Sequence, residues 1–96
     1  MLTGKQKSYL RGLANRERAI FQIGKDGVNS NLIDAIEEYL KAHELCKISL
    51  LKTCEYETRE MALDLASLTS SEVVQIIGRT VVLYKYQKDG QIILPR

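Results

Sequence analysis

The stretch FQIGKDGVNSNLIDAI, residues 21–36, joins a short apolar run to a helix-like pattern through a turn with two glycines. The β-branched and aromatic side chains within residues 19–24 favour a strand. Asn29 or Ser30 is placed to cap the helix that follows, which we expect to run to about His43. The stretch therefore predicts a strand, a tight turn at GKDG and a helix.

The pattern continues on both sides of this unit. A helix is predicted over residues 2–16, with Thr3 as its N-cap. The short Gly78-Arg79 link predicts a hairpin. The remaining predicted elements are strands at residues 45–52, 72–78 and 80–86, a helix at 57–70, and an extended segment at 91–95 across an edge or a face of the sheet.

The element order α-β-α-β-α-β-β indicates the fold class. Strands that alternate with helices imply crossover connections and parallel pairing, and the final hairpin adds an antiparallel pair. We therefore predict a small two-layer α/β sandwich, with one domain spanning residues 1–96.

Apolar residues at helical or strand spacing identify the expected core. In the strand at 45–52, alternate side chains should face opposite sides, with Cys46, Ile48 and Leu50 on one of them. The predicted core positions of the helices are Tyr9, Leu10, Leu13 and Ala14, then Leu32, Ile33, Ile36 and Leu40, then Met61, Ala62, Leu65 and Leu68.

Composition narrows the class of protein. Of the 96 residues, 45% are apolar and 27% are charged, which is typical of a globular domain. No apolar run is long enough for a membrane helix, and the N-terminus lacks the apolar core of a signal peptide, so we expect a cytoplasmic protein. Cys46 and Cys54 are expected to be reduced thiols, one buried and one near a loop. With a single histidine and no CxxC spacing, no metal site is expected.

The net charge of +2 hides a segregated distribution. Residues 1–25 carry six bases against one acid, residues 26–72 carry ten acids against four bases, and residues 73–96 carry four bases against one acid. A basic head, an acidic middle and a basic tail favour a polyanionic partner on one side of the molecule.

The GKDG turn is the strongest candidate for such a contact. Its glycines permit close approach of a ligand to the backbone, and unpaired amides at the start of the next helix favour an anion. Lys25 adds a positive charge at the tip, whereas Asp26 opposes it. GxxG loops of this kind clamp nucleic-acid backbones, although many strand-to-helix turns contain glycine for geometry alone.

The first helix is a second candidate because it carries Lys5, Lys7 and Arg11. If this helix packs beside the strand that leads to GKDG, its basic face and Lys25 would form one continuous patch. Such a patch would track a phosphate backbone, with charge supplying most of the affinity.

Two other kinds of site receive less support. Tyr84 and Tyr86 should share one face of the last strand, where exposed rings can stack on bases, but packing beneath the helices is the favoured interpretation. The Walker, Rossmann and serine-triad motifs are all absent, so neither an enzyme nor a cofactor is expected.

Four segments in order, LTGKQKSYLRGLA, IGKDGVN, HELCKISLL and VVQIIGRTVVLYK, resemble the CRM domain (chloroplast RNA splicing and ribosome maturation) in its stand-alone bacterial form, the YhbY-like proteins. The resemblance implies a fold similar to the C-terminal domain of translation initiation factor three. In that fold four strands form a mixed sheet in the order 1-2-4-3, with strand 4 antiparallel to the others.

The resemblance also implies RNA binding, and ribosome biogenesis on precursors of the large (50S) ribosomal subunit, with ribosomal proteins or assembly factors as possible partners. It implies no small-molecule substrate and no membrane contact. The implied RNA-binding positions are Gly24, Lys25, Asp26 and Gly27 in the GxxG loop, and Lys5, Lys7 and Arg11 in the first helix. The alternative is a protein-interaction module whose acidic middle helices dock a basic partner.

Overall fold

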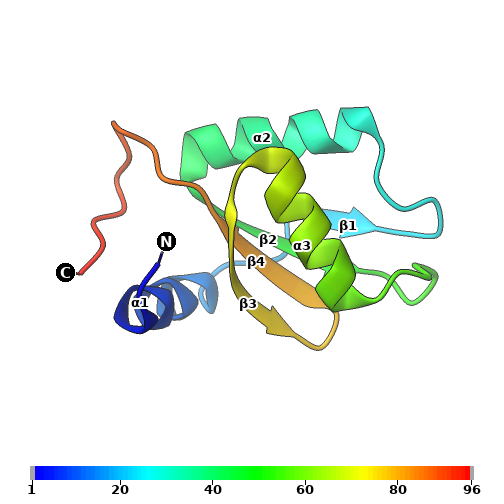
Figure 1. Cartoon of the computed structure of the whole chain (residues 1–96), viewed down its shortest axis with the longest axis horizontal. Coiled ribbons are helices and arrows are strands. Elements are labelled where there is room, and N and C mark those ends of the chain that lie inside the picture. Colours follow the sequence, from blue (N-terminus) through cyan, green and yellow to red (C-terminus); the bar gives the residue numbers. More distant parts are fainter. Residues whose placement is uncertain (1, 96) are drawn as a thin grey trace.

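The computed structural model describes residues 2–95. These residues fold into three helices and four strands in the predicted order (Figure 1). The elements are α1 (Gly4–Ala14), β1 (Phe21–Ile23), α2 (Ser30–His43), β2 (Leu45–Leu50), α3 (Thr58–Thr69), β3 (Glu72–Ile77) and β4 (Thr80–Tyr84).

The four strands form one mixed sheet in the order β1-β2-β4-β3. β1 and β2 are parallel, whereas β4 runs antiparallel to β2 and to β3. β3 and β4 form a hairpin closed by Gly78 and Arg79. The α/β class, the sheet order and the antiparallel β4 are therefore confirmed.

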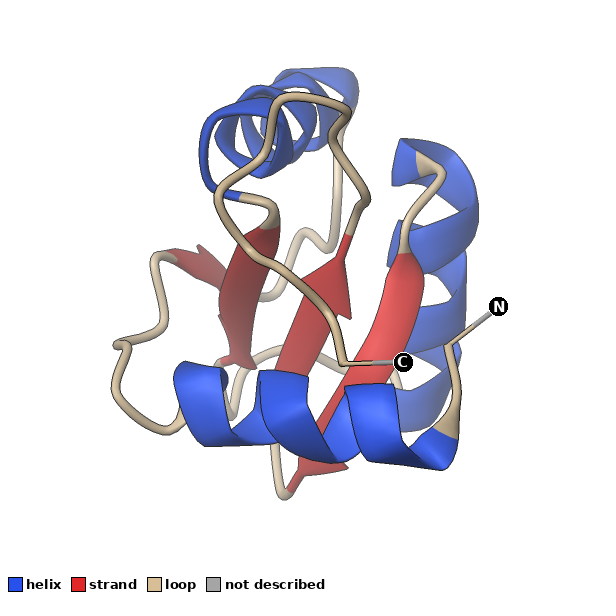
Figure 2. Ribbon diagram, turned by 90° about the vertical axis from the view of Figure 1, so that its left-hand side faces the viewer, coloured by secondary structure: helices blue, strands red, loops and turns tan. Residues whose placement is uncertain are grey.

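A separate apolar cluster packs on each face of the sheet. Cys46, Ile48 and Leu50 of β2 face α2 and α3, as predicted from their alternation. Leu45 of β2 and Val82 of β4 face the opposite way and pack with α1. The sheet with α2 and α3 forms the expected sandwich, and α1 covers the other face of the sheet, toward the viewer in Figure 2.

The helix starts are fixed by side-chain caps. Thr3 and Gln6 form a capping box at α1, in which each side chain accepts from the other residue's backbone amide. Asn29 caps α2, and its Oδ1 accepts from the Leu32 amide at 2.8 Å. Asn29, rather than Ser30, is therefore the N-cap of the helix after the GKDG turn.

Some core predictions are wrong at the margins of the helix stripes. Tyr9 and Leu68 are 44% and 51% exposed, because each lies at the edge of its helix stripe. Thr69 is buried beside Leu68 instead, and its Oγ1 donates to the Leu65 carbonyl at 2.7 Å. Both cysteines are buried, although Cys54 lies in the loop after β2.

The C-terminal segment crosses the same face of the sheet as α1 (Figure 2). Ile92 and Leu94 pack into the cluster under α1, and the Gln6 side-chain amide donates to the Pro95 carbonyl. The predicted segment at 91–95 therefore lies across a face, but it forms no strand. Within residues 2–95, no helix has the length and apolar character that crossing a membrane requires.

Candidate nucleic-acid interface

The GKDG sequence forms a tight turn at the carboxyl end of β1. The Gly27 amide donates to the Gly24 carbonyl at 3.1 Å, which leaves Lys25 and Asp26 exposed at the tip. Gly27 has a φ of 68°, in the left-handed region that other residues rarely adopt. The backbone conformation at this position therefore requires a glycine.

A second turn lies against the first. The Leu51 amide donates to the Ile23 carbonyl at 2.8 Å, which extends the β1–β2 pairing beyond the strands. The chain then reverses, and the Cys54 amide donates to the Leu51 carbonyl at 2.9 Å. A side chain at Gly24 would contact Leu51 and Thr53, since its Cβ would lie 3.6 Å and 3.7 Å from their nearest atoms.

The β3–β4 hairpin closes the same end of the sheet. The Leu50 amide donates to the Arg79 carbonyl at 2.7 Å, and the Arg79 guanidinium donates to the Leu51 carbonyl at 3.0 Å. Three turns from distant parts of the sequence therefore lie side by side, and each exposes a cation: Lys25, Lys52 and Arg79.

Tyr56 completes this end of the molecule. A Cβ on Gly27 would lie 2.8 Å from Cε2 of Tyr56, so the ring rests directly against the glycine backbone. The ring is nevertheless 52% exposed. Sequence reasoning missed Tyr56, because a loop aromatic carries no periodic pattern and its contact depends on how β1 and β2 are paired.

The start of α2 adds a backbone component. Its first turn contains no acidic residue, and Asn29 supplies its side-chain cap. Because the first amides of a helix point outward and the helix dipole is positive there, this terminus favours an anion over a cation. Gly24, Lys25, Asp26 and Gly27 all lie in the turn immediately before it.

The basic residues of α1 are at the other end of the molecule. Lys5 and Arg11 are exposed and Lys7 is half-buried. α1 packs across β2, β4 and β3 rather than beside β1. In Figure 1, α1 and the GKDG turn lie toward opposite ends of the longest axis, along which the molecule measures 39 Å. The expected continuous patch of α1 and Lys25 is therefore wrong, and the candidate residues form two surfaces.

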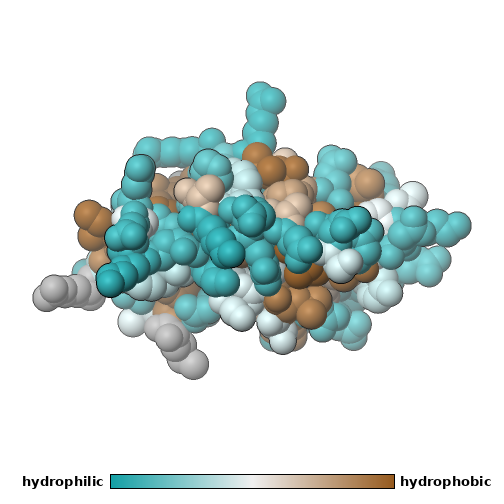
Figure 3. Space-filling model, turned by 90° about the horizontal axis from the view of Figure 1, so that it is seen from above, coloured by the Kyte–Doolittle hydropathy of each residue, from teal (hydrophilic) through white to brown (hydrophobic). Residues whose placement is uncertain are grey.

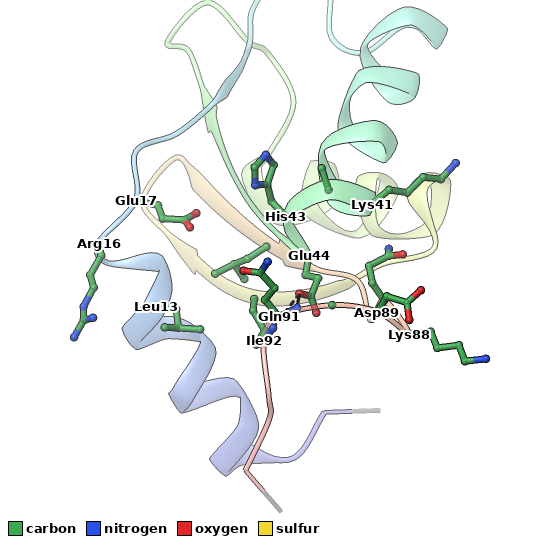
Figure 4. Close-up of a pocket in the computed structure, with 14 residues that line it drawn as sticks. Leu13, Arg16, Glu17, Lys41, His43, Glu44, Lys88, Asp89, Gln91 and Ile92 are labelled. Atoms are coloured by element: carbon green, nitrogen blue, oxygen red, sulfur yellow. Dashed lines mark hydrogen bonds between the residues drawn. The ribbon is translucent and has the colours of Figure 1, made fainter.

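A groove of about 940 Å³ lies between the ends of α1 and α2 and residues 87–92 (Figure 4). Glu44 projects into it, while the side chains of Arg16, Lys41 and Lys88 point away. Oε2 of Glu44 accepts from the amides of Gln91 and Ile92 at 2.7 Å and 3.0 Å. Glu44 thus holds the C-terminal segment along one wall of the groove, and the mixed charges of the lining point to no particular ligand.

The two candidate tyrosines do not share an exposed surface. Tyr84 is 2% exposed, and its hydroxyl has no hydrogen-bond partner. Burial raises its pKa, with smaller contributions from Glu44, Tyr86 and Glu72. Tyr86 is 71% exposed but follows the end of β4. Packing beneath the helices, the interpretation that the sequence favours for both rings, is therefore confirmed for Tyr84 and wrong for Tyr86.

The cysteines show no sign of reactivity. Cys46 is fully buried, and burial, with a smaller effect of the Glu17 charge, raises the pKa of its thiol to about 12. Across residues 2–95, no group of three or more His, Cys, Asp or Glu side chains is arranged to hold a metal ion. The single histidine, His43, stacks on Tyr39 with ring centroids 4.3 Å apart.

Comparison with known proteins gives consistent matches over nearly the whole chain. The model of the CRS1 / YhbY (CRM) domain matches residues 2–85. The chain is 50% identical to the probable RNA-binding protein YqeI of Bacillus subtilis, covering 99% of this chain and 100% of YqeI. It is 32% identical to an RNA-binding protein of Haemophilus influenzae, covering 99% and 96% of the two chains. The solution structure of the hypothetical protein SAV1595 from Staphylococcus aureus superposes with a TM-score of 0.84 at 46% identity, covering 99% and 100%.

Proposed function

The chain belongs to the CRS1 / YhbY (CRM) domain family, and on that premise we propose that it is an RNA-binding protein that acts in ribosome biogenesis. It binds rRNA in cytoplasmic precursors of the large (50S) ribosomal subunit, without a cofactor or a catalytic step. Other assembly factors and ribosomal proteins are its neighbours there. The contact residues are Gly24, Lys25, Asp26 and Gly27 in the GKDG turn, and Lys5, Lys7 and Arg11 on α1.

The observation that carries this proposal is the geometry of the GKDG turn. It exposes Lys25 between two half-buried glycines, just before a helix start that has no acid in its first turn. A phosphate at this turn meets backbone amides, the positive end of the helix dipole and the ammonium of Lys25. Contacts of this kind position a nucleic acid without reading its sequence.

The basic face of α1 supplies the second contact. The basic face of α1 lies away from the GKDG turn, so the two contacts do not form one continuous surface for a single short strand of RNA. Two separate contacts instead suit a structured RNA, in which different segments of backbone approach the protein from different sides. Folded rRNA offers such segments.

Crosslinking the protein to RNA in cells, followed by sequencing of the contacted sites, tests the proposal. We expect the crosslinks to concentrate in rRNA of the large-subunit precursor, and to weaken when Lys25 and Arg11 are both replaced by alanine. Crosslinks spread evenly over unrelated RNAs would overturn the role in ribosome biogenesis.

A complete lack of RNA binding at low salt would favour the alternative, a module that docks a basic protein. The surface over α2 is largely hydrophilic (Figure 3), and its exposed acids include Asp34 and Glu38. In that case, binding to a basic partner should weaken when these two acids are replaced by their amides.

A further inference from the structure

We propose that Tyr56, Lys52 and Arg79 form a binding site for an unpaired nucleotide next to the GKDG turn. The inference rests on the proposed RNA-binding function and adds the class of RNA that this end of the molecule selects. A phosphate lies on the GKDG turn, and the base attached to it stacks on the Tyr56 ring.

The contacts around the turns hold these residues in one place. The GKDG turn, the turn after β2 and the β3–β4 hairpin are tied together by the Leu51–Ile23 and Leu50–Arg79 backbone hydrogen bonds. The Arg79 side chain is also fixed, because it donates to the Leu51 carbonyl. Neighbouring strands of a sheet lie roughly 5 Å apart, so cations on adjacent turns fall within reach of consecutive phosphates.

Tyr56 has the features of a stacking platform. One side of its ring is held against the Gly27 backbone, while about half of the residue, 52%, remains exposed. An exposed ring that is already held in place loses little conformational freedom when a base stacks on it. Its position against the second glycine of GKDG also sets the base close to a phosphate bound at that turn.

Because the charges of these loops are mixed, binding here depends on the Tyr56 ring. Lys25, Lys52 and Arg79 are accompanied by the exposed acids Asp26, Glu55 and Glu57. Attraction from a distance is therefore weak here, and binding depends on short-range contacts. Because the bases of a duplex already stack on one another, only an unpaired base can use the Tyr56 ring. The site therefore favours single-stranded or looped RNA over a continuous duplex.

Titrations of the full chain with an eight-nucleotide oligouridine and with a blunt RNA duplex test this inference. We expect Tyr56→Ala to weaken oligouridine binding roughly tenfold, within the range that base–aromatic stacking gives, and to leave duplex binding unchanged. Tyr56→Phe, which keeps the ring, should bind as the wild type does. Tyr86→Ala is the matched control, since Tyr86 is 71% exposed but lies outside the three turns.

The charged residues have a matched control of their own. Lys52→Ala and Arg79→Ala should each weaken oligouridine binding several-fold, whereas Lys88→Ala, also at an exposed position, should not. The Tm of each variant, measured in parallel, identifies any loss of folded protein. Arg79→Lys is a second variant that keeps the charge should Arg79→Ala unfold.

The outcomes separate this inference from the function on which it rests. If oligouridine binding weakens in Lys25→Ala but not in Tyr56→Ala, RNA binding stands and the nucleotide site is wrong. Equal losses for oligouridine and duplex in Tyr56→Ala would also overturn it, as would a loss in Tyr86→Ala instead. If the wild type binds neither RNA at low salt, the proposed function itself fails.

Discussion

Gly27 is the residue at which fold and proposed function depend most directly on each other. Its positive φ allows the GKDG turn to close, and its missing side chain allows the Tyr56 ring to lie on the backbone. A side chain there would disturb both the turn and the ring. The same position therefore determines the local backbone and the surface offered to a ligand.

Replacing Gly27 with valine should lower the free energy of unfolding by about 1–2 kcal/mol through the positive φ alone. It should also displace Tyr56 and weaken RNA binding. Chemical denaturation and an RNA titration measure the two effects. Repeating the change in a Tyr56→Ala background removes the steric part and leaves the backbone part. As a control, Gly12→Ala, where a new Cβ meets nothing within 4 Å, should stabilise α1 by up to about 1 kcal/mol.

Tyr84 provides a test of a buried polar group. Its hydroxyl is buried without a partner, so Tyr84→Phe removes an unsatisfied group while keeping the ring in the core. We expect the free energy of unfolding to rise by about 1 kcal/mol, and RNA binding to stay unchanged. A loss of stability on this substitution would mean that the hydroxyl has a partner in solution.

Cys46 should make stability depend on alkaline pH. The pKa of its thiol rises from an ordinary value of 9.0 to about 12 on folding. Above about pH 9 the thiol therefore ionises in the unfolded chain but not in the folded one, so the folded state loses stability as pH rises toward 12. This contribution, up to about 1.4 kcal/mol per pH unit, should be absent in Cys46→Ala, as urea unfolding at successive pH values would reveal. Identical pH profiles would contradict it.

At the scale of the elements, the sequence predicts the helices and strands better than their contacts. Thr3 and Asn29 cap helices where the sequence places them, and the alternation of β2 identifies which side chains face α2 and α3. The face of the sheet that α1 covers could not be predicted, because an apolar stripe can pack on either face. For the same reason, the contact of Tyr56 with Gly27 was not predictable: it requires knowing that β1 and β2 are adjacent.

The separation of α1 from the GKDG turn predicts independent contributions to RNA binding. Lys25→Ala and Arg11→Ala should each weaken binding, and the double variant should lose the sum of the two free energies within about 0.5 kcal/mol. The wild type should show a slope of log affinity against log salt of roughly −3, and each substitution should reduce its magnitude by about one. Both residues are exposed, so the Tm should hardly change. Strong non-additivity would indicate that the residues contact one site.

At the scale of the whole molecule, Glu44 links the chain's centre to its C-terminal segment. It is only 4% exposed, has a positive φ of 67°, and accepts from the amides of Gln91 and Ile92. That contact holds the C-terminal segment at the corner between α2 and β2. The segment in turn covers apolar side chains that α1 leaves uncovered.

Glu44→Ala should therefore destabilise the C-terminal segment more than it destabilises the sheet. We expect the amides of Gln91 and Ile92 to lose protection from hydrogen exchange, and the free energy of unfolding to fall by about 1–3 kcal/mol. Among the amides of β2 and β4, the ranking by protection from hydrogen exchange should be the same as in the wild type. Unchanged exchange at Gln91 and Ile92 would show that other contacts hold the segment.

The placement of the two proposed RNA contacts, on α1 and at the GKDG turn, toward opposite ends of a 39 Å molecule has a consequence for affinity. Once one end is bound, a second RNA segment tethered to the first is presented to the other end at a high effective concentration, provided that the RNA between them spans the protein. The two weak contacts then bind one RNA molecule at the same time, as two donor atoms of a chelating ligand bind one metal ion. Such a protein would bind a correctly folded RNA far more tightly than either segment alone. Its affinity would depend on the distance between the two RNA segments rather than on their sequence.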